Sequence, residues 1–170
     1  MSNPDTVNHF NEQGDAHMVD VGTKAVTTRV ALAAGEILMA DSTLERIASG
    51  RMGKGDVLGV ARIAAIQATK RTWELIPLAH PLLLTGVEVE LTPTYGPARV
   101  VCRAEVRCIG QTGIEMEALT AVSVGLLTIY DMCKAIDRGM LLQNIGLLRK
   151  EGGKTGLWER PPPASCPPVR

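Results

Sequence analysis

The chain has 170 residues, of which 45% are hydrophobic, 21% charged and 3% aromatic, and its formal net charge is zero. This composition predicts one compact domain with an aliphatic core. A neutral chain has no general attraction to nucleic acid or to an anionic membrane, so we expect neither partner and expect any anion site to be local. We see no secretory leader and no uninterrupted apolar stretch of about 18 residues, which predicts a soluble protein in the cytoplasm.

The two ends of the chain differ in composition from its middle. Residues 1–16 are polar and lack hydrophobic periodicity, and the final sequence ERPPPASCPPVR has too many prolines for a helix or an inner strand. We therefore predict flexible arms at residues 1–16 and 159–170, on either side of a single domain at residues 17–158. The four cysteines form no CxxC pair and no cluster with histidines, so neither a zinc site nor a disulfide framework is indicated.

The first predicted elements follow the polar arm. From Lys24, the sequence KAVTTRVALAAGEILMA has the β-branched residues of extended chain, with a turn predicted at Gly35. A short helix is predicted in DSTLERIAS, with Asp41 and Ser42 as candidate N-caps and Gly50 as its end.

A longer helix and a hairpin come next. The helix is predicted to begin at Gly55 or Asp56 and to continue until Pro77, because small and aliphatic residues keep returning to one of its sides. The segments GVEVEL and ARVVCRAEVRCI both alternate apolar and polar residues and are separated by the turn TPTYGP. This pattern predicts an antiparallel hairpin with one apolar face and one solvent-exposed face, on which glutamates of one strand lie opposite arginines of the other.

The last predicted elements complete the order of helices and strands along the chain. A third helix is predicted from Thr112 or Gly113 to about Arg138, and MLLQNIGLLRK supplies a final strand. The order matches the split βαβ arrangement, so the predicted fold class is α+β: a ferredoxin-like sandwich, with two long helices packed on one face of an antiparallel sheet. RNA-binding domains with this scaffold stack bases on aromatic residues of the central strands. The predicted strands contain no such aromatic residues, so RNA binding is disfavoured.

The third helix is apolar around most of its circumference from residue 118 to residue 132, and one sheet cannot cover all of it. Ala118, Ala121 and Gly125 would permit close approach of another backbone. This favours a subunit interface, with burial inside one domain as the alternative.

Charged residues interrupt this helix at both ends. Glu117 and Asp131 share one stripe but lie about 21 Å apart along the helix axis, so they cannot touch one reacting atom within a single helix. They would mark two ends of a long ligand or meet through a partner subunit. Lys134 lies three residues after Asp131, and an ordinary ion pair at a helix C-terminus is the structural alternative to a functional role.

Three further segments carry candidate ligand groups. Lys54 in GKGDV precedes a helix N-terminus, where free N–H groups can hold phosphate, although a solvated loop lysine is the alternative. The sequence GGKTG contains Lys154, but a Walker motif would need glycine at Leu148, so a glycine loop or a solvated linker remains. His80 lies between two prolines and is either a core histidine or a site residue. No spacing indicates metal ligands.

Together these segments resemble one family. The stretches GDAHMVDV, KGDV, ARIAAIQATKRTWELIPLAHPL, TGIEMEALTAVSVGLLTIYDMCKA and GGKTG are similar to cyclic pyranopterin monophosphate synthases, the molybdenum cofactor biosynthesis protein C family, over about residues 14–157. The resemblance implies a ferredoxin-like lyase of molybdenum cofactor (molybdopterin) biosynthesis. It would convert (8S)-3′,8-cyclo-7,8-dihydroguanosine 5′-triphosphate, made from GTP by a radical cyclase, to cyclic pyranopterin monophosphate and pyrophosphate. It further implies a hexamer, a trimer of dimers, with active sites between subunits.

The resemblance also assigns site residues. Asp131, Lys134 and Lys54 would be catalytic. The substrate would meet the LxHP segment, the EME segment and a loop lysine, namely Leu78, Ala79, His80, Glu115, Met116, Glu117 and Lys154. No resident cofactor or metal is implied, and whether Mg²⁺ accompanies the triphosphate stays open. The chain departs from the family pattern at Ala79, where some members have cysteine, and in RMGKGD, which lacks a histidine that often precedes the lysine.

The implied chemistry leads to a mechanistic hypothesis. We expect Lys134 and Lys54 to exchange protons with the substrate, with each pKa lowered by mutual repulsion and partial burial, while Asp131 orients Lys134. His80 and Lys154 would bind the triphosphate or protonate the leaving group, and Glu117 would accept hydrogen bonds from guanine-derived N–H groups. The competing classes are a nucleotide-binding oligomer without catalysis and an inactive structural subunit.

Overall fold

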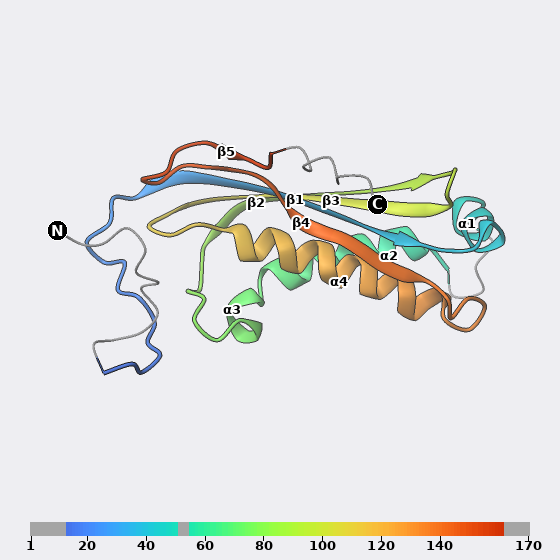
Figure 1. Ribbon diagram of the computed structural model, residues 1–170, viewed down its shortest axis with the longest axis horizontal. Coiled ribbons are helices and arrows are strands. Elements are labelled where there is room, and N and C mark those ends of the chain that lie inside the picture. Colours follow the sequence, from blue (N-terminus) through green and yellow to red (C-terminus); the bar gives the residue numbers. More distant parts are fainter. Residues whose placement is uncertain (1–12, 51–54, 162–170) are drawn as a thin grey trace, which may run out of the picture.

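The computed structural model describes residues 13–50 and 55–161. Its elements, in chain order, are β1 (Thr27–Leu38), α1 (Asp41–Ala48), α2 (Val57–Thr69), α3 (Thr72–Leu75), β2 (Leu84–Thr94), β3 (Arg99–Gly110), α4 (Glu115–Cys133), β4 (Leu141–Glu151) and β5 (Trp158–Glu159). One antiparallel sheet has the order β2-β3-β1-β4-β5, and α2 and α4 lie together on one of its faces (Figure 1). This arrangement confirms the predicted ferredoxin-like α+β sandwich.

The strand β1 runs unbroken through Gly35, so the turn predicted at that residue is wrong. A Cβ atom at Gly35 would lie 2.8 Å from Cγ1 of Ile145 and 2.9 Å from Cγ1 of Val122. The register between β1 and β4 also shifts at this point. Glycine is needed here because neighbouring side chains pack against the strand backbone itself, not because the chain turns.

The helix α1 begins without the side-chain cap that was predicted at Asp41 or Ser42. Its preceding residue, Ala40, instead donates its N–H to Oδ2 of Asp137 at 2.9 Å, and the hydroxyl of Thr43 donates to the same oxygen at 3.1 Å. The stabilising carboxylate therefore comes from a remote part of the chain, which a local capping pattern cannot show.

The start of α2 agrees with the predicted beginning at Gly55 or Asp56, since Asp56 is the residue that precedes and caps the helix. Oδ1 of Asp56 accepts a hydrogen bond from the N–H of Gly59 at 2.9 Å, as an N-cap aspartate should. The predicted continuation to Pro77 is wrong, because α2 ends at Thr69 and the short α3 follows. At this break the hydroxyl of Thr69 donates to the carbonyl of Ile66, and neighbouring residues turn the chain toward the segment that contains His80.

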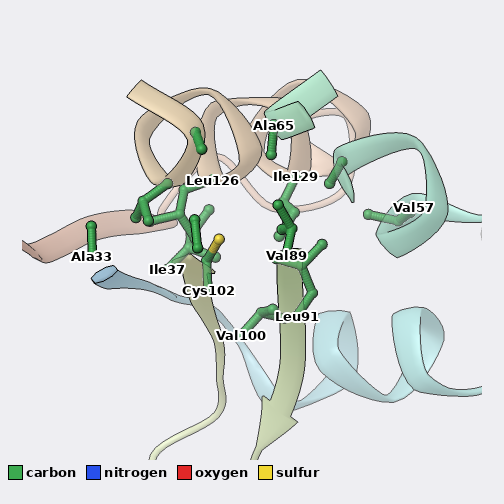
Figure 2. Close-up of a cluster of buried hydrophobic side chains, with 14 of the residues drawn as sticks. Ala33, Ile37, Val57, Ala65, Val89, Leu91, Val100, Cys102, Leu126 and Ile129 are labelled. Carbon is green, nitrogen blue, oxygen red and sulfur yellow. The ribbon is translucent and has the colours of Figure 1, made fainter. Parts of the chain in front are cut away.

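The core lies between the sheet and the two long helices. Figure 2 shows Val89 and Leu91 of β2 and Val100 of β3 in one buried cluster with Leu126 and Ile129 of α4. All five side chains are buried, so the predicted apolar face of the hairpin is the face that the helices cover.

The small residues of α4 pack inside this chain. Ala118 and Ala121 are fully buried, and a Cβ atom at Gly125 would lie 3.3 Å from Cβ of Ala65 on α2. The close approach of α2 therefore explains the small residues, and their predicted use at a subunit interface is wrong. By length and composition α4 could cross a membrane, but more than half of it is buried in the fold, as is typical of a core helix.

Three remaining expectations concern α4, the cysteines and the chain ends. The third predicted helix is shorter than expected, since α4 starts at Glu115 and ends at Cys133 instead of near Arg138. Three cysteines are buried free thiols: Cys102, Cys108 and Cys133. The predicted arms lie mostly outside the described residues, so the domain limits stay predictions.

Candidate active site

A cavity of about 440 Å³ lies beside the N-terminus of α4. Its walls come from three separate parts of the chain, residues 19–24, 76–82 and 112–117. Six predicted substrate-binding residues line it: Leu78, Ala79, His80, Glu115, Met116 and Glu117. The fold therefore brings the LxHP and EME segments together at one hollow, which we call the ring recess.

A second cavity of about 580 Å³ adjoins the ring recess and shares Lys24, Thr112 and Gly113 with it. Arg29 and Lys154 also line this second hollow, which we call the cation recess after the basic side chains in its wall. None of the described residues that line it is acidic. Three basic side chains without a competing carboxylate make the cation recess suited to an anion such as a phosphate group.

The loop that carries Lys154 depends on glycine. Gly152 and Gly153 have φ values of 92° and 74°, which residues with a Cβ atom rarely adopt. A Cβ atom at Gly152 would also lie 2.3 Å from the carbonyl oxygen of Thr28 in β1. The glycines therefore let the loop pass close to β1, and β5 then pairs with β4 to close it. This places Lys154 at the cation recess, in an ordered turn between two strands.

Glu117 is the buried acid of the ring recess, with only 4% of its surface exposed. Burial raises the pKa of its carboxyl group to about 7, and the charge of Glu115 acts in the same direction. Glu115 itself pairs with Lys150, whose Nζ lies 3.1 Å from Oε1 of Glu115. Near neutral pH, Glu117 therefore populates both protonation states and can accept or donate a hydrogen bond.

His80 forms part of the wall of the ring recess and is half-buried, so it is not the fully packed core histidine that was one alternative. Its Nε2 lies 2.9 Å from the carbonyl oxygen of Val19. A carbonyl oxygen only accepts hydrogen bonds, so this contact places a proton on Nε2. His80 thus holds the N-terminal segment against the recess.

Asp131 and Lys134 lie at the other end of α4 and line neither recess. Nζ of Lys134 is 2.8 Å from Oδ1 of Asp131, and 54% and 64% of the two side chains are exposed. The hydrogen bond that Lys134 donates to Asp131 raises the pKa of Lys134, because the carboxylate stabilises the ammonium form. The expectation of a lowered pKa is therefore wrong for Lys134 in a single copy of the chain, and the same expectation for Lys54 stays a prediction. Lys54 lies outside the described residues.

Sequence reasoning missed three residues at these hollows, namely Lys24, Arg29 and Gln111. Nε2 of Gln111 donates to the carbonyl oxygens of Gly22 and Lys24, at 3.0 Å in each case. All three stand at or near strand ends, where no local motif marks them, and only the pairing of β1 with β3 brings them together. Within the described part of the chain, no three His, Cys, Asp or Glu side chains gather as a candidate metal site.

A family comparison agrees with this geometry. The model of the MoaC family matches residues 18–153, which is most of the chain. The match includes the LxHP and EME segments of the ring recess and the Asp131–Lys134 pair, and it ends just before Lys154. The chain therefore belongs to the MoaC family, whose members are enzymes of molybdenum cofactor biosynthesis.

Proposed function

We propose that this chain is a cyclic pyranopterin monophosphate synthase, a lyase that converts (8S)-3′,8-cyclo-7,8-dihydroguanosine 5′-triphosphate to cyclic pyranopterin monophosphate and pyrophosphate. The observation that carries the proposal is the junction of the two recesses at Lys24, Thr112 and Gly113. A substrate with a guanine-derived ring at one end and a triphosphate at the other needs two such environments side by side.

The ring recess suits the guanine-derived end of this substrate. When ionised, the buried carboxylate of Glu117 accepts hydrogen bonds from the amino group and the ring N–H group. Leu78 and Met116 supply apolar contact beside it. Because the pKa of Glu117 is raised to about 7, ligand N–H groups that stabilise its charged form would be bound strongly there.

The cation recess suits the triphosphate. Lys24, Arg29 and Lys154 line it, and their positive charges would bind the phosphate groups of the substrate in the ground state and in the transition state alike. In the bond-forming step a ribose-derived hydroxyl attacks the α-phosphorus, a new O–P bond forms, and the bond from the α-phosphorus to the pyrophosphate oxygen breaks. The proton of the hydroxyl passes to the departing pyrophosphate.

The Asp131–Lys134 pair suits the proton transfers that ring opening and rebuilding require. Its short ion pair keeps Lys134 in the ammonium form, so we assign it the role of proton donor rather than base. Asp131 orients the ammonium group. Lys54 is proposed to act with Lys134 as the second catalytic lysine.

Because the Asp131–Lys134 pair lies about 21 Å along α4 from Glu117, one chain does not complete the proposed site. We therefore propose a homo-oligomer, a hexamer built as a trimer of dimers, in which a neighbouring copy supplies the pair. Exposed apolar side chains on the outer surfaces of α2 and α4 support such burial, since Val60, Ile63 and Leu127 are 45%, 70% and 55% exposed.

The proposal includes the setting of the reaction. A radical GTP cyclase would supply the substrate, no nucleic acid or membrane takes part, and the reaction takes place in the cytoplasm. The proposed chemistry uses no resident cofactor, and comparing turnover in Mg²⁺ with turnover in a chelator tells whether a metal ion accompanies the triphosphate.

The experiment supplies the cyclised triphosphate and follows pyrophosphate together with the fluorescent oxidation product of the pterin. Lys134→Ala and Asp131→Asn should lose turnover while the assembly stays intact, and wild-type rates in both variants would contradict the proposal. A nucleotide-binding oligomer without catalysis would keep its affinity and yield no product at any protein concentration. An inactive structural subunit would show neither binding nor turnover.

A further inference from the structure

Gln111 lies between β3 and α4 and lines the cation recess. Its side chain reaches across to a segment that is remote in sequence. Nε2 is 3.0 Å from the carbonyl oxygen of Gly22 and 3.0 Å from that of Lys24. A side-chain amide carries two N–H donors, so these two contacts use both of them.

The segment that Gln111 holds contains no helix or strand from residue 17 to residue 26. Its internal bonds are local, from the N–H of Gly22 to Oδ1 of Asp20 at 2.8 Å and from the N–H of Lys24 to the carbonyl of Val21 at 2.9 Å. Long-range support comes from His80 at Val19 and from Gln111 at the turn itself. Segments with little regular structure depend strongly on such single side-chain contacts for their position.

We propose that Gln111 is a positioning residue that acts through Lys24. By holding the turn at residues 21–24, it fixes the backbone from which the Lys24 side chain reaches the junction of the two recesses. A lysine side chain is long and rotates freely, so its ammonium group is placed only as well as its backbone is placed. The inference rests on the proposed function, because the phosphates of the substrate are the ligand that Lys24 would bind.

The size of the effect follows from the two hydrogen bonds. A neutral hydrogen bond contributes about 1 kcal/mol net, which corresponds to roughly a fivefold change in an equilibrium constant. Loss of both bonds in Gln111→Leu should therefore raise KM by about 5- to 25-fold. The value of kcat should stay within about twofold, because Lys24 is expected to bind the phosphates in ground state and transition state alike.

A double-mutant cycle with Gln111→Leu and Lys24→Met separates positioning from general structural damage. If Gln111 acts through Lys24, the double variant has the same KM as Lys24→Met alone. The matched control is Gln143→Leu, which removes a glutamine amide that donates to Oε1 of Glu36 at 2.7 Å and lines neither recess. The control should leave KM and kcat unchanged. A wild-type KM in Gln111→Leu, or additive effects in the cycle, would overturn the inference.

Two measurements need no turnover and keep the inference separate from the proposed function. Amide hydrogen exchange at Lys24 should be about 5- to 25-fold faster in Gln111→Leu than in wild type, and unchanged in Gln143→Leu. Inorganic pyrophosphate, followed by calorimetry, should bind more weakly to Gln111→Leu. If wild type makes no product, the proposed function fails, and unchanged exchange together with unchanged pyrophosphate affinity would overturn the inference on its own. Gln111→Met repeats each measurement with another side chain that lacks the donor.

Discussion

The buried carboxyl group of Glu117 makes the stability of this protein depend on pH in an unusual direction. Its pKa is about 7 in the folded chain, against an ordinary value of 4.5. Between these values the folded chain holds a proton that the unfolded chain has released, so the free energy of unfolding falls as pH rises. The contribution is fully present below pH 4.5 and is lost as pH rises through about 7.

The substitution Glu117→Gln removes this titration while nearly keeping the shape of the side chain. A pKa difference of 2.5 (7 less 4.5) corresponds to about 3 kcal/mol at full ionisation. Relative to wild type, the variant should therefore gain about 3 kcal/mol of unfolding free energy at pH 8 and only about 1 kcal/mol at pH 5. It should also lose catalytic activity, because an amide cannot make both of the hydrogen bonds that the carboxylate is proposed to accept from the substrate.

Urea unfolding at several pH values and one fixed protein concentration measures this gain. The matched control is Glu45→Gln, which makes the same substitution at an exposed carboxylate on α1. If Glu117→Gln and wild type differ by the same free energy at pH 5 and pH 8, the reasoning from burial is refuted.

Three other predictions use different parts of the fold. Leu126→Ala should lower the free energy of unfolding by about 2–5 kcal/mol, since Leu126 is fully buried. Leu83→Ala, at a site that is 89% exposed, should change it by less than about 0.5 kcal/mol, and equal losses would contradict the assignment of Leu126 to the core. Gly152→Ala should lower the free energy of unfolding by about 1–3 kcal/mol, because φ is 92° and a Cβ atom would meet the carbonyl of Thr28. Thermal or urea unfolding measures this loss, and wild-type stability in the variant would contradict the loop conformation described above. Lys154→Met should raise KM for the triphosphate by roughly tenfold at low salt and by less at high salt, because salt screens the attraction between a lysine and a phosphate group. An increase in KM that does not depend on salt would argue against a contact between Lys154 and phosphate.

Much of the fold was predictable because local patterns and packing agree. The alternation of Val87, Val89 and Leu91 predicts the buried face of β2, and the structure buries that face beneath the helices. The start of α2 near Asp56 was predictable for the same reason, since the hydrogen-bond partner of Asp56 is three residues away. The failures at Gly35 and at the start of α1 have the opposite cause. In both places the deciding contact comes from a distant residue, Ile145 or Asp137.

The residues of the candidate site also include some that the sequence could predict and some that it could not. His80 and Glu117 stand in distinctive segments, so resemblance to a family points to them from the amino-acid sequence alone. Lys24, Arg29 and Gln111 carry no such mark, because their importance arises only when the strands pair and the N-terminal segment folds across the end of the sheet. The direction of the pKa shift at Lys134 was predicted wrongly, because the hydrogen bond and the charge of Asp131, which raise this pKa, outweigh the burial that lowers it.

The central claim is that one copy of the chain supplies the two recesses and a neighbouring copy supplies the Asp131–Lys134 pair. Mixing Glu117→Gln with Lys134→Ala chains during assembly tests this claim directly. Two inactive variants should then regain roughly a quarter of wild-type turnover, because half of the dimers are mixed and each mixed dimer holds one intact site. Mixing Lys134→Ala with Asp131→Asn should restore nothing, since both changes damage the same side of the site. Turnover in the first mixture no higher than in either variant alone would contradict the account.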